Sequence, residues 1–180
     1  EINVFSFFRI AATASYRWVN GFDATGGFKD DDLSSFGATL TLRFGGFDYR
    51  IRALSDRQQF ADPTGAAERA GISSANWCLF GQVWPAGRVL AQAMSGFDVA
   101  GKRILELGCG LGLSSLVLNR RKADITASDH HPLAEEFLTY NAALNGLAVP
   151  AYLDIAWTLP QPGLGKFDLI IASDVLYERG

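Results

Sequence analysis

The chain has 180 residues, of which 48% are hydrophobic, which is enough apolar material for one sizeable core but hardly for two. The formal net charge of −3 provides no broad basic surface for nucleic acid, and the one basic cluster, Arg120-Arg121-Lys122, suits the last turn of a helix. Two cysteines, Cys78 and Cys109, are too few for a disulfide scaffold and lack zinc-site spacing, and no apolar run reaches the roughly 18 residues of a membrane helix. We therefore expect a cytoplasmic protein without nucleic-acid partners.

The first 47 residues alternate apolar with polar or small side chains at period two. This pattern predicts strands within FRIAATASYRWVNGFD (8–23) and SFGATLTLRFGGF (35–47), so that residues 1–47 form a β-hairpin extension. The segment is also similar to the last strands of outer-membrane β-barrels, which often finish on an aromatic residue, as this one would at Phe47. In that case it would be foreign to the domain that follows at 48–180, and a membrane partner is expected only then.

A polar connector and a helix come next. Residues 55–71, SDRQQFADPTGAAERAG, contain the turn formers Pro63 and Gly65 and are expected to form the connector. The stretch NWCLFGQVWPAGRVLAQAM (76–94) carries two tryptophans into a predicted helix whose first turn holds Pro85.

Strands and helices alternate in the remaining sequence. We predict strands at 103–107, 124–128, 151–155 and 166–173, and helices at 111–121 and 132–146. The second helix has Pro132 at its expected start and Gly146 at its end. Such alternation implies right-handed crossovers, and the predicted fold class is α/β with a Rossmann-like parallel sheet.

Three glycines follow the first of these strands. Gly108, Gly110 and Gly112 stand in the strand-to-helix turn, where the backbone of such a sheet comes closest to a ligand. A tight turn without a ligand would need only one glycine. The dinucleotide pattern G-x-G-x-x-G fails because Leu113 occupies its third small position, which disfavours an NAD-dependent oxidoreductase.

The pattern that fits is an acidic residue, a spacer and G-x-G-x-G, which runs from Glu106 to Gly112. It resembles the cofactor loop of class I S-adenosylmethionine-dependent methyltransferases. The resemblance implies that Glu106, Gly108, Cys109 and Gly110 bind S-adenosylmethionine. Asp129 ends the next strand, 21 residues after Gly108, where a carboxylate can accept hydrogen bonds from both ribose hydroxyls.

Two further segments narrow this resemblance. GQVWPAGRVLA and FDLIIASDVLY are similar to motifs of the seven-strand lysine methyltransferase family and its bacterial nicotinamide N-methyltransferase-like relatives. The resemblance implies that Trp84 lies against the cofactor, that Trp157 flanks the adenine and that Ser173 contacts the cofactor. Family members often have an acidic or amide residue directly before the second tryptophan. This chain has Ala156 there and Asp154 two residues earlier, so a contact to the adenine amine is in doubt.

The family's D-x-x-Y pattern corresponds to Asp174 and Tyr177, which are the predicted catalytic residues. They would hold an amine close to the methyl group, so the predicted enzyme is an N-methyltransferase that acts on a protein lysine or a small nitrogen acceptor. A structural alternative is that Asp174 caps the next segment and Tyr177 packs. A functional alternative is a binding or regulatory module that has lost the chemistry.

Two neighbouring features predict no chemistry of their own. His130 and His131 lack further spaced ligands, so we predict no metal site and expect the pair at a helix entry. Cys109 sits where the turn needs a small residue, and no histidine is placed by sequence to activate it.

Both ends of the chain predict a fragment. It opens on Glu1 rather than methionine, and only four strands precede Gly180, whereas the sheet of class I methyltransferases has seven. The C-terminal strands are therefore expected to be missing, and we expect the natural protein to continue for about 40–70 residues.

Overall fold

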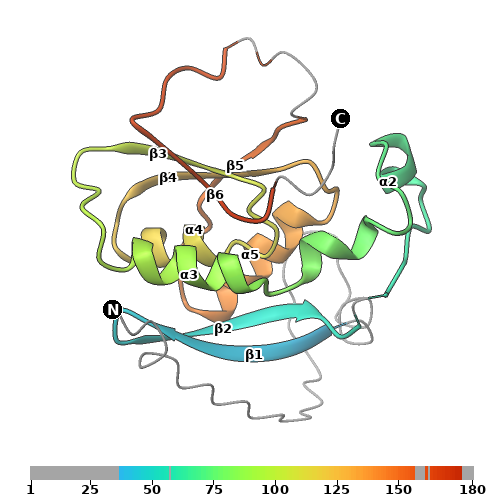
Figure 1. Cartoon of the computed structure of the whole chain (residues 1–180), viewed down its shortest axis with the longest axis horizontal. Coiled ribbons are helices and arrows are strands. Elements are labelled where there is room, and N and C mark those ends of the chain that lie inside the picture. Colours follow the sequence, from blue (N-terminus) through green and yellow to red (C-terminus); the bar gives the residue numbers. More distant parts are fainter. Residues whose placement is uncertain (1–36, 57, 157–160, 162, 176–180) are drawn as a thin grey trace, which may run out of the picture.

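The computed structural model describes residues 37–56, 58–156, 161 and 163–175 (Figure 1). Four strands form a parallel sheet in the order β5-β4-β3-β6: β3 (Arg103–Leu107), β4 (Asp124–Asp129), β5 (Ala151–Asp154) and β6 (Leu169–Ala172). Three helices lie together on one side of this sheet: α3 (Pro85–Met94), α4 (Leu113–Arg120) and α5 (Ala134–Leu144). The predicted α/β class and Rossmann-like sheet are confirmed.

The strand order fixes where a ligand can bind. The chain steps outward from β3 to β4 and β5 and then returns to the opposite side of β3 as β6. The order of connection therefore reverses between β3 and β6. In open parallel sheets the crevice outside the carboxyl ends of the strands at such a point is the usual ligand site.

Proline and glycine mark the helix ends, with one difference from the sequence-based expectation. Pro85 is the first residue of α3, as predicted, and Gly146 takes the left-handed conformation (φ 62°) after α5. Pro132 does not lie in the first turn of α5, because that helix begins at Ala134. No helix in the described part of the chain has the length and apolar character needed to span a bilayer.

A separate two-stranded sheet lies beyond the helices (Figure 1). Strands β1 (Gly37–Phe44) and β2 (Phe47–Leu54) pair antiparallel along their whole length and are joined by Gly45-Gly46, both with positive φ, as a type I′ turn requires. The hairpin thus crosses the expected boundary at 47. The upstream strand at 8–23 lies outside the described residues, and the division into domains stays a prediction.

The second strand of this hairpin was missed by sequence reasoning, although alternate side chains of β2 are buried. Asn141 of α5 and Asn145, directly after this helix, hold it. Asn141 Oδ1 accepts the backbone N–H of Arg52 at 2.6 Å, and Asn145 Oδ1 accepts that of Arg50 at 2.9 Å. The hairpin is therefore packed on the α/β unit through β2, while most of β1 is exposed.

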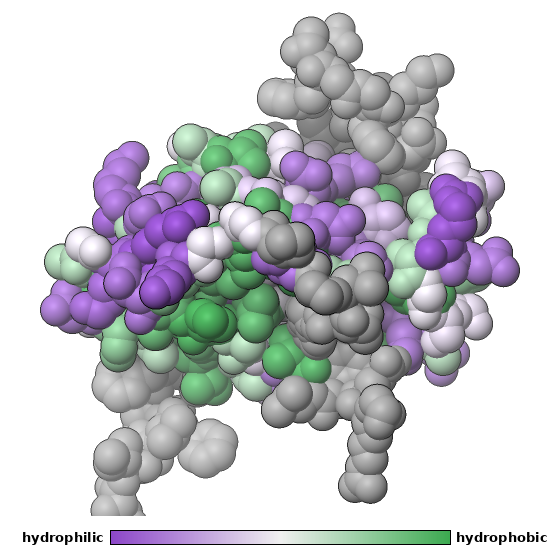
Figure 2. Space-filling view, turned by 90° about the horizontal axis from the view of Figure 1, so that it is seen from above, coloured by the Kyte–Doolittle hydropathy of each residue, from purple (hydrophilic) through white to green (hydrophobic). Residues whose placement is uncertain are grey.

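The sheet has an apolar edge in the described structure. Ile170 of β6 is 58% exposed, and Val89 of α3 is also exposed. From above, the molecule shows apolar surface in its middle and polar surface toward both ends (Figure 2).

Two short elements connect the hairpin to α3: the helix α2 (Ala66–Arg69) and the 3-10 helix η2 (Trp77–Gly81).

Candidate active site

A cleft of about 990 Å³ opens at the carboxyl ends of the parallel strands. It brings together eight of the predicted site residues: Trp84, Glu106, Gly108, Cys109, Gly110, Asp129, Ser173 and Asp174. The other two, Trp157 and Tyr177, lie outside the described residues. The sequence motifs after β3, β4 and β6 therefore line one cavity, as the strand order requires.

The glycine turn is shaped by packing as well as by its place in the cleft. Gly108, Gly110 and Gly112 all have positive φ, between 51° and 77°. A Cβ on Gly110 would lie 2.6 Å from the carbonyl oxygen of Phe80, and a Cβ on Gly112 would collide with Leu138. The glycines are thus needed for the close approach of η2 and α5 to the turn, whether or not a ligand is bound.

Glu106, near the end of β3, connects that strand to the first turn of α4 beyond the glycines. Its side chain is buried, and Oε2 accepts hydrogen bonds from the backbone N–H (2.9 Å) and the hydroxyl of Ser115. Burial raises the pKa of the carboxyl to about 7, because desolvation outweighs the donors from Ser115 and Ser114. Glu106 therefore fixes the first turn of α4 against β3 and also lines the cleft.

Asp129 joins the turn to the end of β4. One carboxylate oxygen accepts the N–H of Gly110 at 2.8 Å, and the other accepts those of His130 (2.8 Å) and His131 (2.9 Å). Burial raises the pKa of this carboxyl, while the same three N–H groups oppose the rise. Both acidic groups thus depend on backbone donors for their position.

The far side of the cleft is formed by α3 and the end of β6. Trp84 precedes α3 and donates its indole N–H to the Leu79 carbonyl at 2.8 Å, which leaves the ring partly exposed at the cleft. Asp174 has φ 55°, a left-handed conformation that is uncommon for a non-glycine residue. Such strain is often found at functional sites.

Aromatic packing behind the cleft was missed by sequence reasoning. His131 stacks on Phe80 with ring centroids 3.7 Å apart and meets Trp77 edge to face at 5.5 Å. Desolvation lowers the pKa of His131 to about 4, so it is a neutral core side chain at ordinary pH. Its Nδ1 accepts the N–H of Leu133 at 3.2 Å, at the entry of α5.

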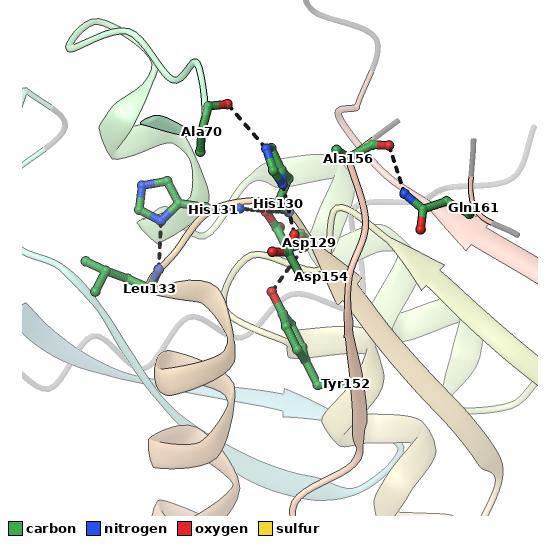
Figure 3. A network of polar contacts seen from close by, with 9 residues as sticks. All are labelled: Ala70, Asp129, His130, His131, Leu133, Tyr152, Asp154, Ala156 and Gln161. Carbon is green, nitrogen blue, oxygen red and sulfur yellow. Dashed lines mark hydrogen bonds and ion pairs between the residues drawn. The ribbon is translucent and has the colours of Figure 1, made fainter. Parts of the chain in front are cut away.

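The other histidine lies at the rim of the cleft. Figure 3 shows His130 between Asp154, at the end of β5, and the carbonyl of Ala70, which follows α2. Among the described residues, no three His, Cys, Asp or Glu side chains gather as metal ligands would. His130 is therefore a connecting residue within the described structure.

Known proteins are similar to this chain in sequence and in fold. A profile of the lysine methyltransferase family matches residues 73–180. The electron transfer flavoprotein beta subunit lysine methyltransferase of Rattus norvegicus is 32% identical over 138 residues, which cover 73% of this chain and 50% of that protein. Protein N-lysine methyltransferase METTL21A of Danio rerio is 34% identical over 139 residues, which cover 71% of this chain and 63% of that protein.

The chain spans about half to two thirds of the length of these relatives. Among solved structures, the T. thermophilus 16S rRNA N2 G1207 methyltransferase RsmC, in complex with AdoMet and guanosine, superimposes with a TM-score of 0.53. The sequence identity is 21%, and the superposition covers 81% of this chain and 34% of that one. This likeness supports the fold.

Proposed function

The chain belongs to the lysine methyltransferase family, and we propose that it uses S-adenosylmethionine to methylate the side-chain nitrogen of a protein lysine. The acidic lining of the cleft is the observation that carries this proposal. Asp129 and Asp174 line it, together with Glu106, whose pKa burial raises to about 7, and no Lys or Arg is among the described lining residues. An acidic cleft suits a sulfonium cofactor and a basic acceptor, because both carry or can carry positive charge.

The same charges argue against an NAD-dependent oxidoreductase. A dinucleotide carries a negatively charged pyrophosphate, which the carboxylates of this cleft would repel. Leu113, where the dinucleotide pattern needs a small residue, is buried as the first residue of α4. The absence of basic groups from the described lining also argues against a nucleic-acid acceptor.

The proposal assigns roles to several of the residues that were predicted to bind the cofactor. The backbone of Gly108, Cys109 and Gly110 lies against the cofactor, and Asp129 accepts hydrogen bonds from its ribose hydroxyls. Ser173, with Trp84 and Trp157, bounds the cofactor on the other sides. S-Adenosylmethionine supplies the methyl group as an electrophile.

Asp174 and Tyr177 are assigned to the acceptor. A carboxylate at the end of β6 attracts the amine, accepts a hydrogen bond from it and so orients its lone pair. The names of the relatives, which are protein lysine methyltransferases, support a protein acceptor over a small amine. Cys78 and Cys109 are both buried, and we expect the protein in the cytoplasm.

Two measurements test the proposal. Calorimetric titration with S-adenosylhomocysteine and with NADH should give binding of the first only; the reverse result would overturn the cofactor assignment. Incubation of the protein with labelled S-adenosylmethionine and a cell lysate should then label a lysine, identified by mass spectrometry. Cofactor binding without any labelling would favour the inactive binding module, and labelling of a small amine would correct the acceptor.

A further inference from the structure

His130 contacts two other segments of the chain, one 24 and one 60 residues away from it in the sequence. Its Nδ1 lies 2.8 Å from Asp154 Oδ1, and its Nε2 lies 3.2 Å from the carbonyl oxygen of Ala70 (Figure 3). Both partners are hydrogen-bond acceptors. Each ring nitrogen thus faces an acceptor, and an N–H on Nε2 donates to the carbonyl of Ala70.

The segment held by this ring forms a side of the cleft. Ala70, Gly71 and Ile72, here called the α2 wall, follow α2 and line the cavity together with Asp129 and His130. Gly71 has φ 76° and turns the chain there. The α2 wall is therefore a bend of the chain placed next to the end of β4.

Few polar contacts fix the α2 wall to the rest of the molecule. Within the described structure, the other hydrogen bonds of residues 62–72 stay inside that segment, such as Glu68 to Asp62 and Arg69 to Thr64. Buried Ala67 gives the segment an apolar anchor at α2. The bond from His130 to Ala70 is the polar link between this wall and the sheet.

The position of His130 in the sequence says which part of a ligand it would affect. It directly follows Asp129, whose carboxylate is assigned to the ribose; its partner Asp154 ends β5, and Ala156, which follows β5, also lines the cleft. The glycine turn lies on the other side of Asp129, to which it is bonded through Gly110. The ligand portion beyond the ribose thus faces the α2 wall.

We propose that His130, oriented by Asp154, is a positioning residue that holds the α2 wall against the sheet and so forms the side of the cleft that receives the nucleoside base of the cofactor. This rests on the proposed function for the identity of the ligand. The contact between His130 and Ala70 itself does not depend on it. His130 follows β4 whereas Asp174 follows β6, on the other side of β3, so we expect His130 to affect cofactor affinity and to leave the transfer step unchanged.

Cofactor affinity and turnover give the first test. His130→Ala should weaken S-adenosylhomocysteine binding by about fivefold, the effect of losing about one hydrogen bond, with turnover at saturating cofactor within about twofold of wild type. Asp154→Ala should weaken binding less. The double variant should bind like His130→Ala alone, because the carboxylate acts through the ring. The proposal would be overturned if the losses of affinity in the two single variants added up in the double variant. It would also be overturned if turnover of His130→Ala at saturating cofactor fell as much as its affinity.

Hydrogen exchange gives the second test, without a ligand. Amides of residues 66–72 should exchange faster in His130→Ala than in wild type, whereas those of α4 should not change. Asp48→Ala is a surface control away from this segment: it removes the carboxylate that pairs with Arg43 at 3.6 Å on the hairpin, and residues 66–72 should exchange in it as in wild type. Unchanged exchange in 66–72 would refute the link itself. If residues 66–72 exchange faster in His130→Ala but the wild-type protein binds no S-adenosylhomocysteine, only the cofactor assignment is refuted and the link stands.

Discussion

Asp129 accepts a hydrogen bond from the backbone N–H of Gly110 at 2.8 Å, so the residue expected at the ribose also holds the glycine turn. With the N–H groups of His130 and His131, this carboxylate has three donors in the described structure. A carboxylate has about four lone-pair sites. If Asp129 binds both ribose hydroxyls as proposed, these must share or replace some of its contacts, and cofactor binding should then depend on the shape of the glycine turn.

Asp129→Ala should weaken S-adenosylmethionine binding by about 1.5–3 kcal/mol, the scale of hydrogen bonds to a charged group. Asp129→Asn should lose less, because its amide oxygen can still accept from Gly110. Isothermal titration calorimetry on variants with wild-type circular dichroism measures both. Unchanged affinity in a folded Asp129→Ala variant would remove the residue from the site.

Gly110→Ala should destabilise the fold more than a glycine substitution elsewhere at similar φ. Gly110 (φ 51°) would place its Cβ 2.6 Å from the Phe80 carbonyl, so backbone must move in addition to the left-handed strain. Gly101 (φ 65°) is the matched control, since a Cβ there meets nothing within 4 Å. Gly101→Ala should cost about 1–2 kcal/mol and Gly110→Ala clearly more. Equal urea midpoints would contradict the clash.

Local features of the sequence were sufficient to predict the four-stranded sheet and its helices. Short apolar runs alternating with helical patterns mark those elements directly, and Gly146 follows α5 in the expected left-handed conformation. Strand β2 was missed because the aromatic at Phe47 was taken as an end, whereas Gly45-Gly46 is a hairpin turn that continues into β2. Here a turn motif carried more information than the change in composition.

His131 should make stability fall on acidification. Burial lowers its folded pKa to about 4, whereas the unfolded value is near 6.5, so the unfolded state alone binds a proton between these values. Stability is present above pH 6.5 and is lost as the pH falls toward 4, by up to about 3 kcal/mol. In His131→Phe, which keeps a ring against Phe80, this slope should be absent. Stability is measured by urea unfolding at pH 4–7. If the free energy of unfolding of wild type and of His131→Phe fell equally with pH, His131 would not be the source of the loss.

The cleft was only partly predictable from sequence. Motif spacing identified the residues at the strand ends, since the carboxyl ends of parallel strands meet at one edge. The contact between His130 and Ala70 was not predictable, because no local pattern specifies which carbonyl a segment 60 residues away presents. The stack of His131 on Phe80 depends in the same way on how η2 folds over the turn.

Asp174 should act on turnover and leave cofactor affinity nearly intact. Its left-handed backbone makes alanine a poor probe, because alanine would add backbone strain at the same time as it removes the charge. Asparagine tolerates the same conformation, so Asp174→Asn removes the charge while keeping the backbone. If the carboxylate orients the amine, turnover should fall by about 10²-fold, as expected for a group that acts on positioning.

Tyr177→Phe should lower turnover less, since it removes only a hydroxyl group from a side chain outside the described structure. Both variants are compared by single-turnover methyl transfer to the acceptor identified in the lysate, with S-adenosylhomocysteine affinity measured in parallel. Wild-type turnover in Asp174→Asn would reduce Asp174 to a structural cap. Loss of S-adenosylhomocysteine affinity would move it into the cofactor site, because a residue that binds only the acceptor cannot change how the free enzyme takes up cofactor.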